Sequence, residues 1–75
     1  MPQYIVSNPE IMSGVPVIKG TRIPISRIVF LLNEGHTIDS VHDLYPQIEK
    51  KVLHEAVKEL IREIDRRSYE KTSLV

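Results

Sequence analysis

Near its N-terminus the chain reads Gly14-Val15-Pro16-Val17-Ile18-Lys19-Gly20-Thr21-Arg22-Ile23-Pro24-Ile25. Two short β-branched runs flank Lys19-Gly20-Thr21-Arg22, where Gly20 can take the positive φ that a tight hairpin often needs. Pro16 and Pro24 cannot donate ladder hydrogen bonds, so the strands must be edges or end there. The stretch predicts a β-hairpin region over residues 3–25, which also includes the β-prone run Tyr4-Ile5-Val6 and the turn signal Ser7-Asn8-Pro9.

The spacing of apolar residues changes to that of a helix after this hairpin. Ser26 is expected to cap a first helix over about 27–34, and Gly35 stands where a helix terminator belongs. Thr37 is expected to cap a second, short helix over roughly 38–44. A proline at position 46 disfavours helical geometry in the residue before it and so ends the second helix.

A third helix is predicted to start near Glu49. Its apolar stripe recurs every three or four residues: Val52, Leu53, Ala56, Val57, Leu60, Ile61 and Ile64. The opposite face is charged, and three ion pairs are expected on it: Glu55 with Lys58, Glu59 with Arg62, and Glu63 with Arg67. The pattern fades after residue 67, so residues 68–75 are expected to form a flexible tail.

The elements together predict one domain over residues 1–75, of a mainly α (α+β) class. A short β-hairpin precedes a three-helix bundle over residues 26–67, which is the architecture of homeodomain-like helix-turn-helix domains. A chain of 75 residues without cysteine buries only about 60% of its unfolded surface, so a homodimer is expected. The hairpin is the favoured dimer contact, because its edge strands need partners. The alternative is the third helix packing against its symmetry mate through exposed Leu or Ile.

Composition narrows the classes of function. Lys and Arg number 10 and Asp and Glu number 10, so bulk charge gives no support for nucleic-acid binding, which must come from local arrangement. No apolar run approaches the roughly 20 residues that span a bilayer, and the first residues do not resemble a signal peptide, so a cytoplasmic protein without membrane contact is expected.

No catalytic, metal or cofactor site is expected. The acidic residues are scattered over helix surfaces, and the serines belong to no nucleophile motif. His36, His42 and His54 have no metal-ligand spacing, and no cysteine assists them. His36 is assigned to the loop between helices, and His42 to the surface of the second helix.

The first turns of the third helix are the candidate DNA-binding site. Gln47 and Lys50 are expected to reach base edges, and Lys51 and Lys58 to hold phosphates, with His54 beside them. An alternative is a solvated face of paired charges. In an alternative arrangement the second helix is the recognition helix. It would present Asp39, Ser40, His42 and Asp43 to DNA, and it is rejected because carboxylates repel phosphates.

The hairpin turn and its flank, Gly20, Thr21, Arg22, Ile23 and Pro24, are the candidate interface. Arg22 has two interpretations. It could reach a phosphate, a partner protein or the second protomer. The favoured interpretation is structural, in which its guanidinium bonds to backbone carbonyls and holds the hairpin on the helices.

The Gly-Thr-Arg-Ile-Pro core and the later Tyr45-Pro46 resemble the signature of a small prokaryotic family, number 433 of the domains of unknown function. The resemblance covers about residues 5 to 61. It implies a homeodomain-like fold and an antitoxin-like role, because members often lie beside genes for PIN-like ribonuclease toxins. The chain departs from the family pattern at Ile48-Glu49, where Leu-Thr is common, so the capping hydroxyl of the last helix is missing.

Two functional hypotheses follow. The first is an antitoxin of a type II toxin-antitoxin pair, which neutralises a PIN-like toxin and represses its own promoter by binding double-stranded DNA as a homodimer. The second is a protein-interaction module that binds a partner through the third helix and tail and does not touch DNA.

Overall fold

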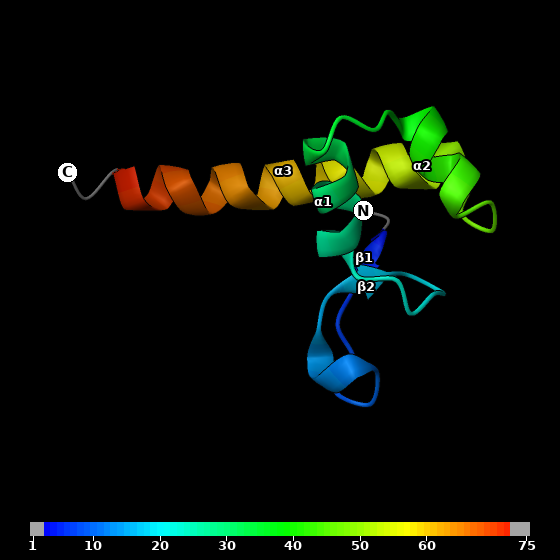
Figure 1. The fold of residues 1–75 in the computed structure, drawn as a ribbon. Coiled ribbons are helices and arrows are strands. Elements are labelled where there is room, and N and C mark those ends of the chain that lie inside the picture. Colours follow the sequence, from blue (N-terminus) through cyan, green and yellow to red (C-terminus); the bar gives the residue numbers. More distant parts are fainter. Residues whose placement is uncertain (1–2, 73–75) are drawn as a thin grey trace.

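A computed structural model describes residues 3–72, and the side chains of residues 3–67. Its elements are β1 (Ile5–Val6), the 3-10 turn η1 (Met12–Gly14), β2 (Val17–Ile18), α1 (Ile25–Asn33), α2 (Ile38–Leu44) and α3 (Lys50–Thr72). Figure 1 shows α1 and α2 beside the first half of α3, with the strands at the lower end of α1. The predicted class, mainly α (α+β) with a short N-terminal β-hairpin followed by three helices, is confirmed.

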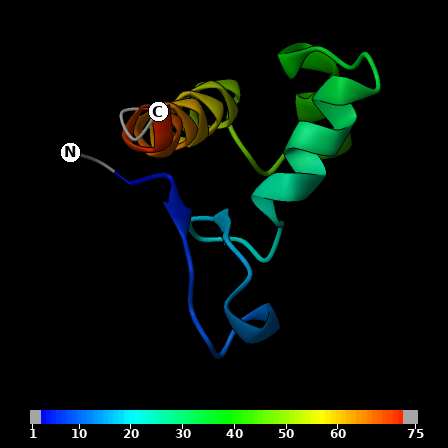
Figure 2. The same cartoon turned by 90° about the vertical axis from the view of Figure 1, so that its left-hand side faces the viewer.

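The sheet pairs β1 with β2 in antiparallel orientation, with Ile5 opposite Ile18 and Val6 opposite Val17. The tight turn predicted after β2 is also present. Gly20 takes a φ of 81°, and the Ile18 N–H donates to the Ile23 carbonyl at 3.0 Å. The second arm of this turn forms only an isolated bridge, because the chain enters α1 at once. The run from residue 4 to residue 6 therefore supplies the second strand of the sheet, and Figure 2 shows this segment beneath the helices.

Helix α1 begins before the position that the sequence suggested. The prediction that Ser26 is its N-cap is wrong: Pro24 holds that position without a side-chain cap. The Ile25 N–H donates to the Pro16 carbonyl at 3.0 Å, and the Ile25 side chain is buried. Tertiary packing of Ile25 thus fixes the start of α1, and Ser26 lies exposed within its first turn.

The predicted stop at Gly35 is confirmed. Gly35 has a φ of 102°, and its N–H donates to the Leu32 carbonyl while that of His36 donates to the Leu31 carbonyl. This pair of bonds is a Schellman motif, which satisfies two carbonyls that the helix end would leave unpaired.

Helix α2 has the predicted bounds and the predicted cap. The Thr37 hydroxyl accepts a hydrogen bond of 3.1 Å from the Ser40 N–H, and the chain leaves the helix at Tyr45. Helix α3 starts one residue after Glu49, close to the prediction, but it ends later. The prediction of a flexible tail over residues 68–75 is wrong for its first part, because α3 continues as far as Thr72; residues 73–75 lie outside the described residues.

The core lies where the three helices meet β2. Its buried side chains come from every one of these elements: Ile18, Ile25, Ile28, Leu31, Val41, Ile48, Leu53 and Ala56. Helix α3 contributes only its first half to this cluster, and its second half extends beyond α1 (Figure 1). Within the described part of the chain, no helix is long and apolar enough to cross a membrane.

Candidate nucleic-acid interface

The connection between α2 and α3 is held by two hydrogen bonds. The Ile48 N–H donates to the Tyr45 carbonyl at 3.0 Å, and the Ile48 carbonyl lies 2.7 Å from Nδ1 of His42. A carbonyl only accepts, so Nδ1 carries the hydrogen in this contact. Because the Ile48 side chain is also buried, α2 and the start of α3 have a fixed relative orientation.

His42 therefore does not lie free on the surface of α2, as the sequence suggested. Its ring is half-buried and bonded to the turn. His36 does lie in the loop between α1 and α2, where its Nδ1 is 2.7 Å from the Ser40 hydroxyl. Each histidine thus stabilises one end of α2: His36 the loop before it and His42 the turn after it.

The predicted DNA-binding residues are all exposed. Lys51, His54 and Lys58 are separated by three and four residues, so they lie on one face of α3. Lys50 is on the adjacent side, where its Nζ lies 3.1 Å from Asp39 of α2. The structure brings these four residues to one region of α3, with Gln47 in the preceding connection.

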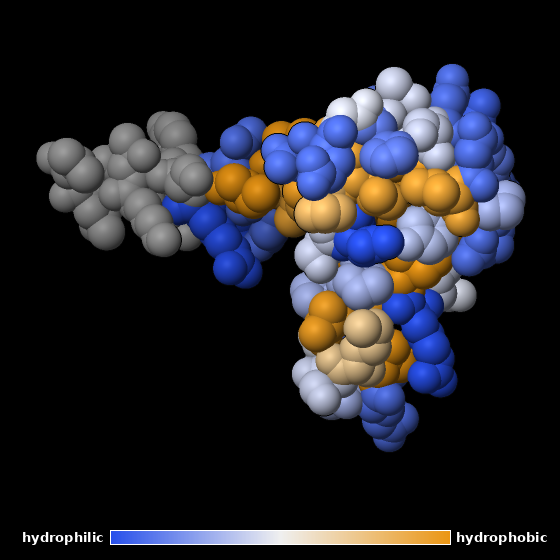
Figure 3. All heavy atoms as spheres, viewed as in Figure 1, coloured by the Kyte–Doolittle hydropathy of each residue, from blue (hydrophilic) through white to orange (hydrophobic). Residues whose placement is uncertain are grey.

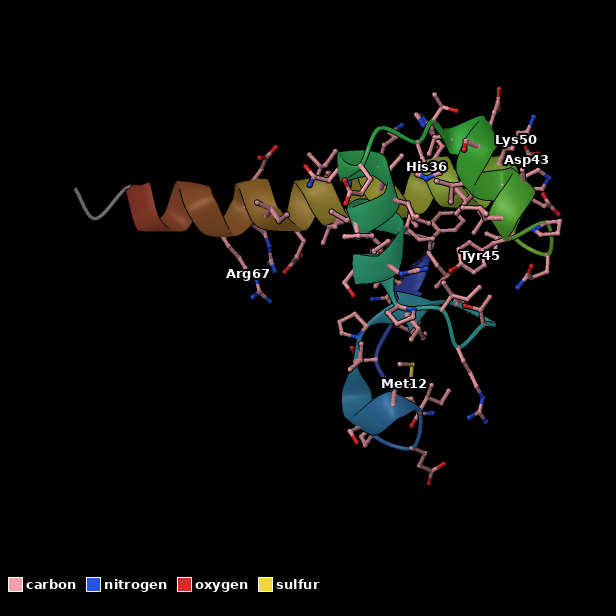
Figure 4. The ribbon with its side chains drawn as sticks, viewed as in Figure 1. Met12, His36, Asp43, Tyr45, Lys50 and Arg67 are labelled. Atoms are coloured by element: carbon pink, nitrogen blue, oxygen red, sulfur yellow. The ribbon has the colours of Figure 1, made fainter. Side chains whose placement is uncertain are left out.

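The charge around this region is mixed. Asp39, Asp43 and Glu49 are exposed near the start of α3, and Figure 4 shows Lys50 and Asp43 at the same end of the molecule. Lys58 lies 3.8 Å from Glu55. An exposed ion pair of this kind contributes about 0–1 kcal/mol, so either lysine can exchange its partner for a phosphate.

In the rejected alternative, α2 and not α3 contacts DNA. This helix presents fewer unpaired polar side chains than its sequence suggested. Ser40 and His42 are both hydrogen-bonded within the chain. Asp39 and Asp43 remain exposed, and their carboxylates would face phosphates directly.

Thr21, and not Arg22, holds the hairpin turn. The Thr21 hydroxyl donates to the Ile18 carbonyl at 2.8 Å and accepts from the Ile23 N–H at 3.0 Å. Arg22 is exposed, and no hydrogen bond or ion pair joins it to residues 3–67. The structural role favoured for Arg22 is therefore wrong, because the shorter threonine already satisfies the carbonyl at the turn. Pro24 and Ile23 are half-buried.

Glu59 has a role that the sequence did not reveal. Its carboxylate accepts hydrogen bonds from the N–H of Tyr4 at 2.8 Å and the N–H of Ile5 at 3.2 Å. The expected Glu59–Arg62 pair is replaced by this contact, which joins β1 to α3. Since the partners are 54 and 55 residues apart in sequence, no local pattern could have indicated it.

Further along α3, the charges pair locally. Glu63 accepts from Arg66 at 2.6 Å and from Arg67 at 3.3 Å, and the second of these pairs was predicted. The hydrogen bond from Arg66, together with Arg67, lowers the pKa of the Glu63 carboxyl below its usual value. Arg66 and Arg67 are exposed, and all three residues lie beyond the part of α3 that packs against α2.

The described residues hold no group of three or more His, Cys, Asp or Glu side chains placed to bind a metal ion. The region offers exposed lysines on the first turns of α3, held in place by the fixed turn before them. Such groups can bind anions such as phosphates.

Comparison with known proteins places the chain in a sequence family. The sequence model of a family described as Protein of unknown function (DUF433) matches residues 5–58. The chain belongs to this family. The match runs from β1 through the first half of α3 and includes the hairpin turn and the connection between α2 and α3; the second half of α3 lies outside it.

One curated relative is "Uncharacterized protein y4eO" of Sinorhizobium fredii (strain NBRC 101917 / NGR234). It is 28% identical over 47 residues, which cover 63% of this chain and 21% of that protein. The chain thus spans about a fifth of the length of this relative. No solved structure matches the chain.

Proposed function

We propose that this DUF433 chain is a DNA-binding antitoxin, which represses its own promoter and neutralises a PIN-like ribonuclease toxin in the cytoplasm. It acts by binding and carries no catalytic site. The observation that carries the DNA-binding part is the fixed α2–turn–α3 unit with Lys51, His54 and Lys58 exposed on one face of α3. The antitoxin part is supported by family membership and the role that the resemblance implies.

In this proposal the first half of α3 enters the major groove of double-stranded DNA. Gln47 and Lys50 reach base edges, while Lys51 and Lys58 contact phosphates. His54 lies between the two lysines on the same face. Because the net charge is zero, binding depends on these local contacts and on a homodimer that presents two α3 helices to two half-sites.

A mobility-shift assay on the upstream DNA, with salt titrated, tests the proposal. Affinity should fall with salt, with a log–log slope near −0.9 for each phosphate neutralised. Lys50→Ala should weaken specific binding by roughly 1–3 kcal/mol if Lys50 reads a base. Arg67→Ala removes an exposed cation on the opposite side of the same helix, where it pairs with Glu63, and should leave specific binding unchanged. A slope near zero, or equal effects of both variants, would contradict DNA reading by α3.

A second function is favoured by the mixed charge of the region: a protein-interaction module without DNA binding. Lys50 already pairs with Asp39, and apolar side chains elsewhere are exposed, among them Met12 and Phe30. This function predicts no shift at low salt, together with co-purification of the protein encoded by a neighbouring gene.

A further inference from the structure

The second half of α3 carries an apolar stripe that the rest of the chain does not cover. Val57 is half-buried, but Ile61 is 50% and Ile64 is 52% exposed. The spacing of four and three residues places these side chains on one face. Figure 3 shows apolar surface continuing along α3 beyond α1, as far as the last side chains that are described.

An open groove of about 840 Å³ borders this stripe at Ile64. Its apolar walls come from the strand segment, α1 and α3, among them Ile5, Ile25 and Leu60. Its rim holds Glu63 and Arg67, whose side chains pair with each other. The apolar surface of the stripe is thus continuous with the groove on one side.

Two opposite charges flank the stripe on its other side. Lys58 and Asp65 are seven residues apart, which is about two turns, so they lie on the same side of α3. Both are exposed. Among the side chains of residues 3–67, Lys58 forms an ion pair with Glu55 alone, at 3.8 Å, and Asp65 forms none.

We infer that the stripe formed by Val57, Ile61 and Ile64 is an interface with a second copy of this chain, with the two α3 helices packed antiparallel about a two-fold axis. In that arrangement Ile61 of each copy packs against Ile64 of the other, and Lys58 of each faces Asp65 of the other. The two-fold axis therefore forms the Lys58–Asp65 pair twice. If the two helices packed in parallel through the same stripe, neither pair would form.

The inference specifies the surface of the dimer in the proposed function, but it does not depend on DNA binding. Lys58 lies at the border between the lysine face and the stripe. In the dimer it faces Asp65 of the other copy, so the phosphate contact on the lysine face falls to Lys51. Asp65 lies outside the predicted DNA-binding residues, so the dimer can be tested through it alone.

Sedimentation equilibrium of the full chain tests the apolar contact. Ile61→Asp combined with Ile64→Asp should raise the dimer dissociation constant by roughly a hundredfold or more, because each carboxylate would be buried unpaired. Leu44→Asp is the matched control, since Leu44 is 53% exposed on α2, and it should leave the constant unchanged. Far-UV circular dichroism checks that each variant keeps its helices. A monomeric wild-type chain, or a dimer that resists the double substitution, would overturn the inference.

A charge exchange tests the antiparallel register. Lys58→Asp alone sets Asp against Asp65 twice, and Asp65→Lys alone sets Lys against Lys58 twice, so each variant should dimerise roughly tenfold more weakly. An equimolar mixture of the two variants restores both pairs in a heterodimer and should recover the wild-type constant. No recovery on mixing overturns the inference. A dimer that ignores all these changes still leaves the proposed function standing, because DNA binding is measured separately.

Discussion

The two halves of α3 have the same kind of sequence but different surroundings. In the first half Leu53 and Ala56 are 0% exposed, whereas in the second half Ile61 and Ile64 are half-exposed. The apolar residues recur at helical spacing in both halves. Periodicity thus identifies the apolar face of a helix, but the other elements decide whether that face is covered.

The charged residues differ in the same way. In the first half two of them contact other elements: Lys50 pairs with Asp39 of α2, and Glu59 binds the backbone of β1. In the second half Glu63 pairs with Arg66 and Arg67 of the same helix. The first half is therefore part of the tertiary structure, and the second half is a helix stabilised by neighbours in sequence.

The largest difference between the halves should appear on truncating an apolar side chain in each. Leu53→Ala should lower the free energy of unfolding by about 2–5 kcal/mol, because it leaves a cavity in the core. Ile64→Ala should cost less than about 1 kcal/mol in dilute protein, since half of the side chain already contacts water. Chemical denaturation of both variants measures this. Equal losses would mean that the second half is packed as tightly as the first.

Glu59 lies at the boundary between the halves, and its removal should lower the free energy of unfolding by an intermediate amount. Glu59→Ala leaves the N–H groups of Tyr4 and Ile5 without their acceptor, which should cost about 1.5–3 kcal/mol. Hydrogen exchange should also accelerate at these two amides. Glu55→Ala, which loses only the contact with Lys58, is the control and should cost well under 1 kcal/mol. If the two variants lose the same stability, the contact between β1 and α3 is not a stabilising one.

The smallest effect on stability is expected from protonating Glu63 in the second half of α3. Its pKa is lowered in the folded chain, first by the hydrogen bond from Arg66. Its ionised form therefore stabilises the helix fully at pH values above the ordinary pKa of 4.5, and this contribution is lost as the pH falls through the lower pKa of the folded chain. Nuclear magnetic resonance titration of the carboxyl should give a midpoint below 4.5.

The same titration should also show a small decrease in the helicity of the second half at acid pH. Arg66→Gln should return the midpoint toward the ordinary value, and high salt should reduce the difference. A midpoint at or above 4.5 in the wild-type chain would mean that these arginines do not hold Glu63 in solution.

The sequence by itself determined the features that depend on neighbours along the chain. The bounds of α2, its Thr37 cap, the stop at Gly35 and the turn at Gly20 all follow from local backbone preferences and short-range hydrogen bonds. It also placed the candidate lysines on α3, because their spacing alone sets their common face. Family membership was predicted from the hairpin turn and the later Tyr45-Pro46.

Only the tertiary structure decided what lies opposite each side chain. It moved the start of α1 to Ile25, whose burial outweighs the capping preference of Ser26. It assigned Glu59 to the backbone of β1 and His42 to the turn before α3. Only the fold could show that Leu53 is covered and Ile61 is not. Such contacts join elements that are remote in sequence, so they depend on how the helices pack and not on the pattern within any one of them.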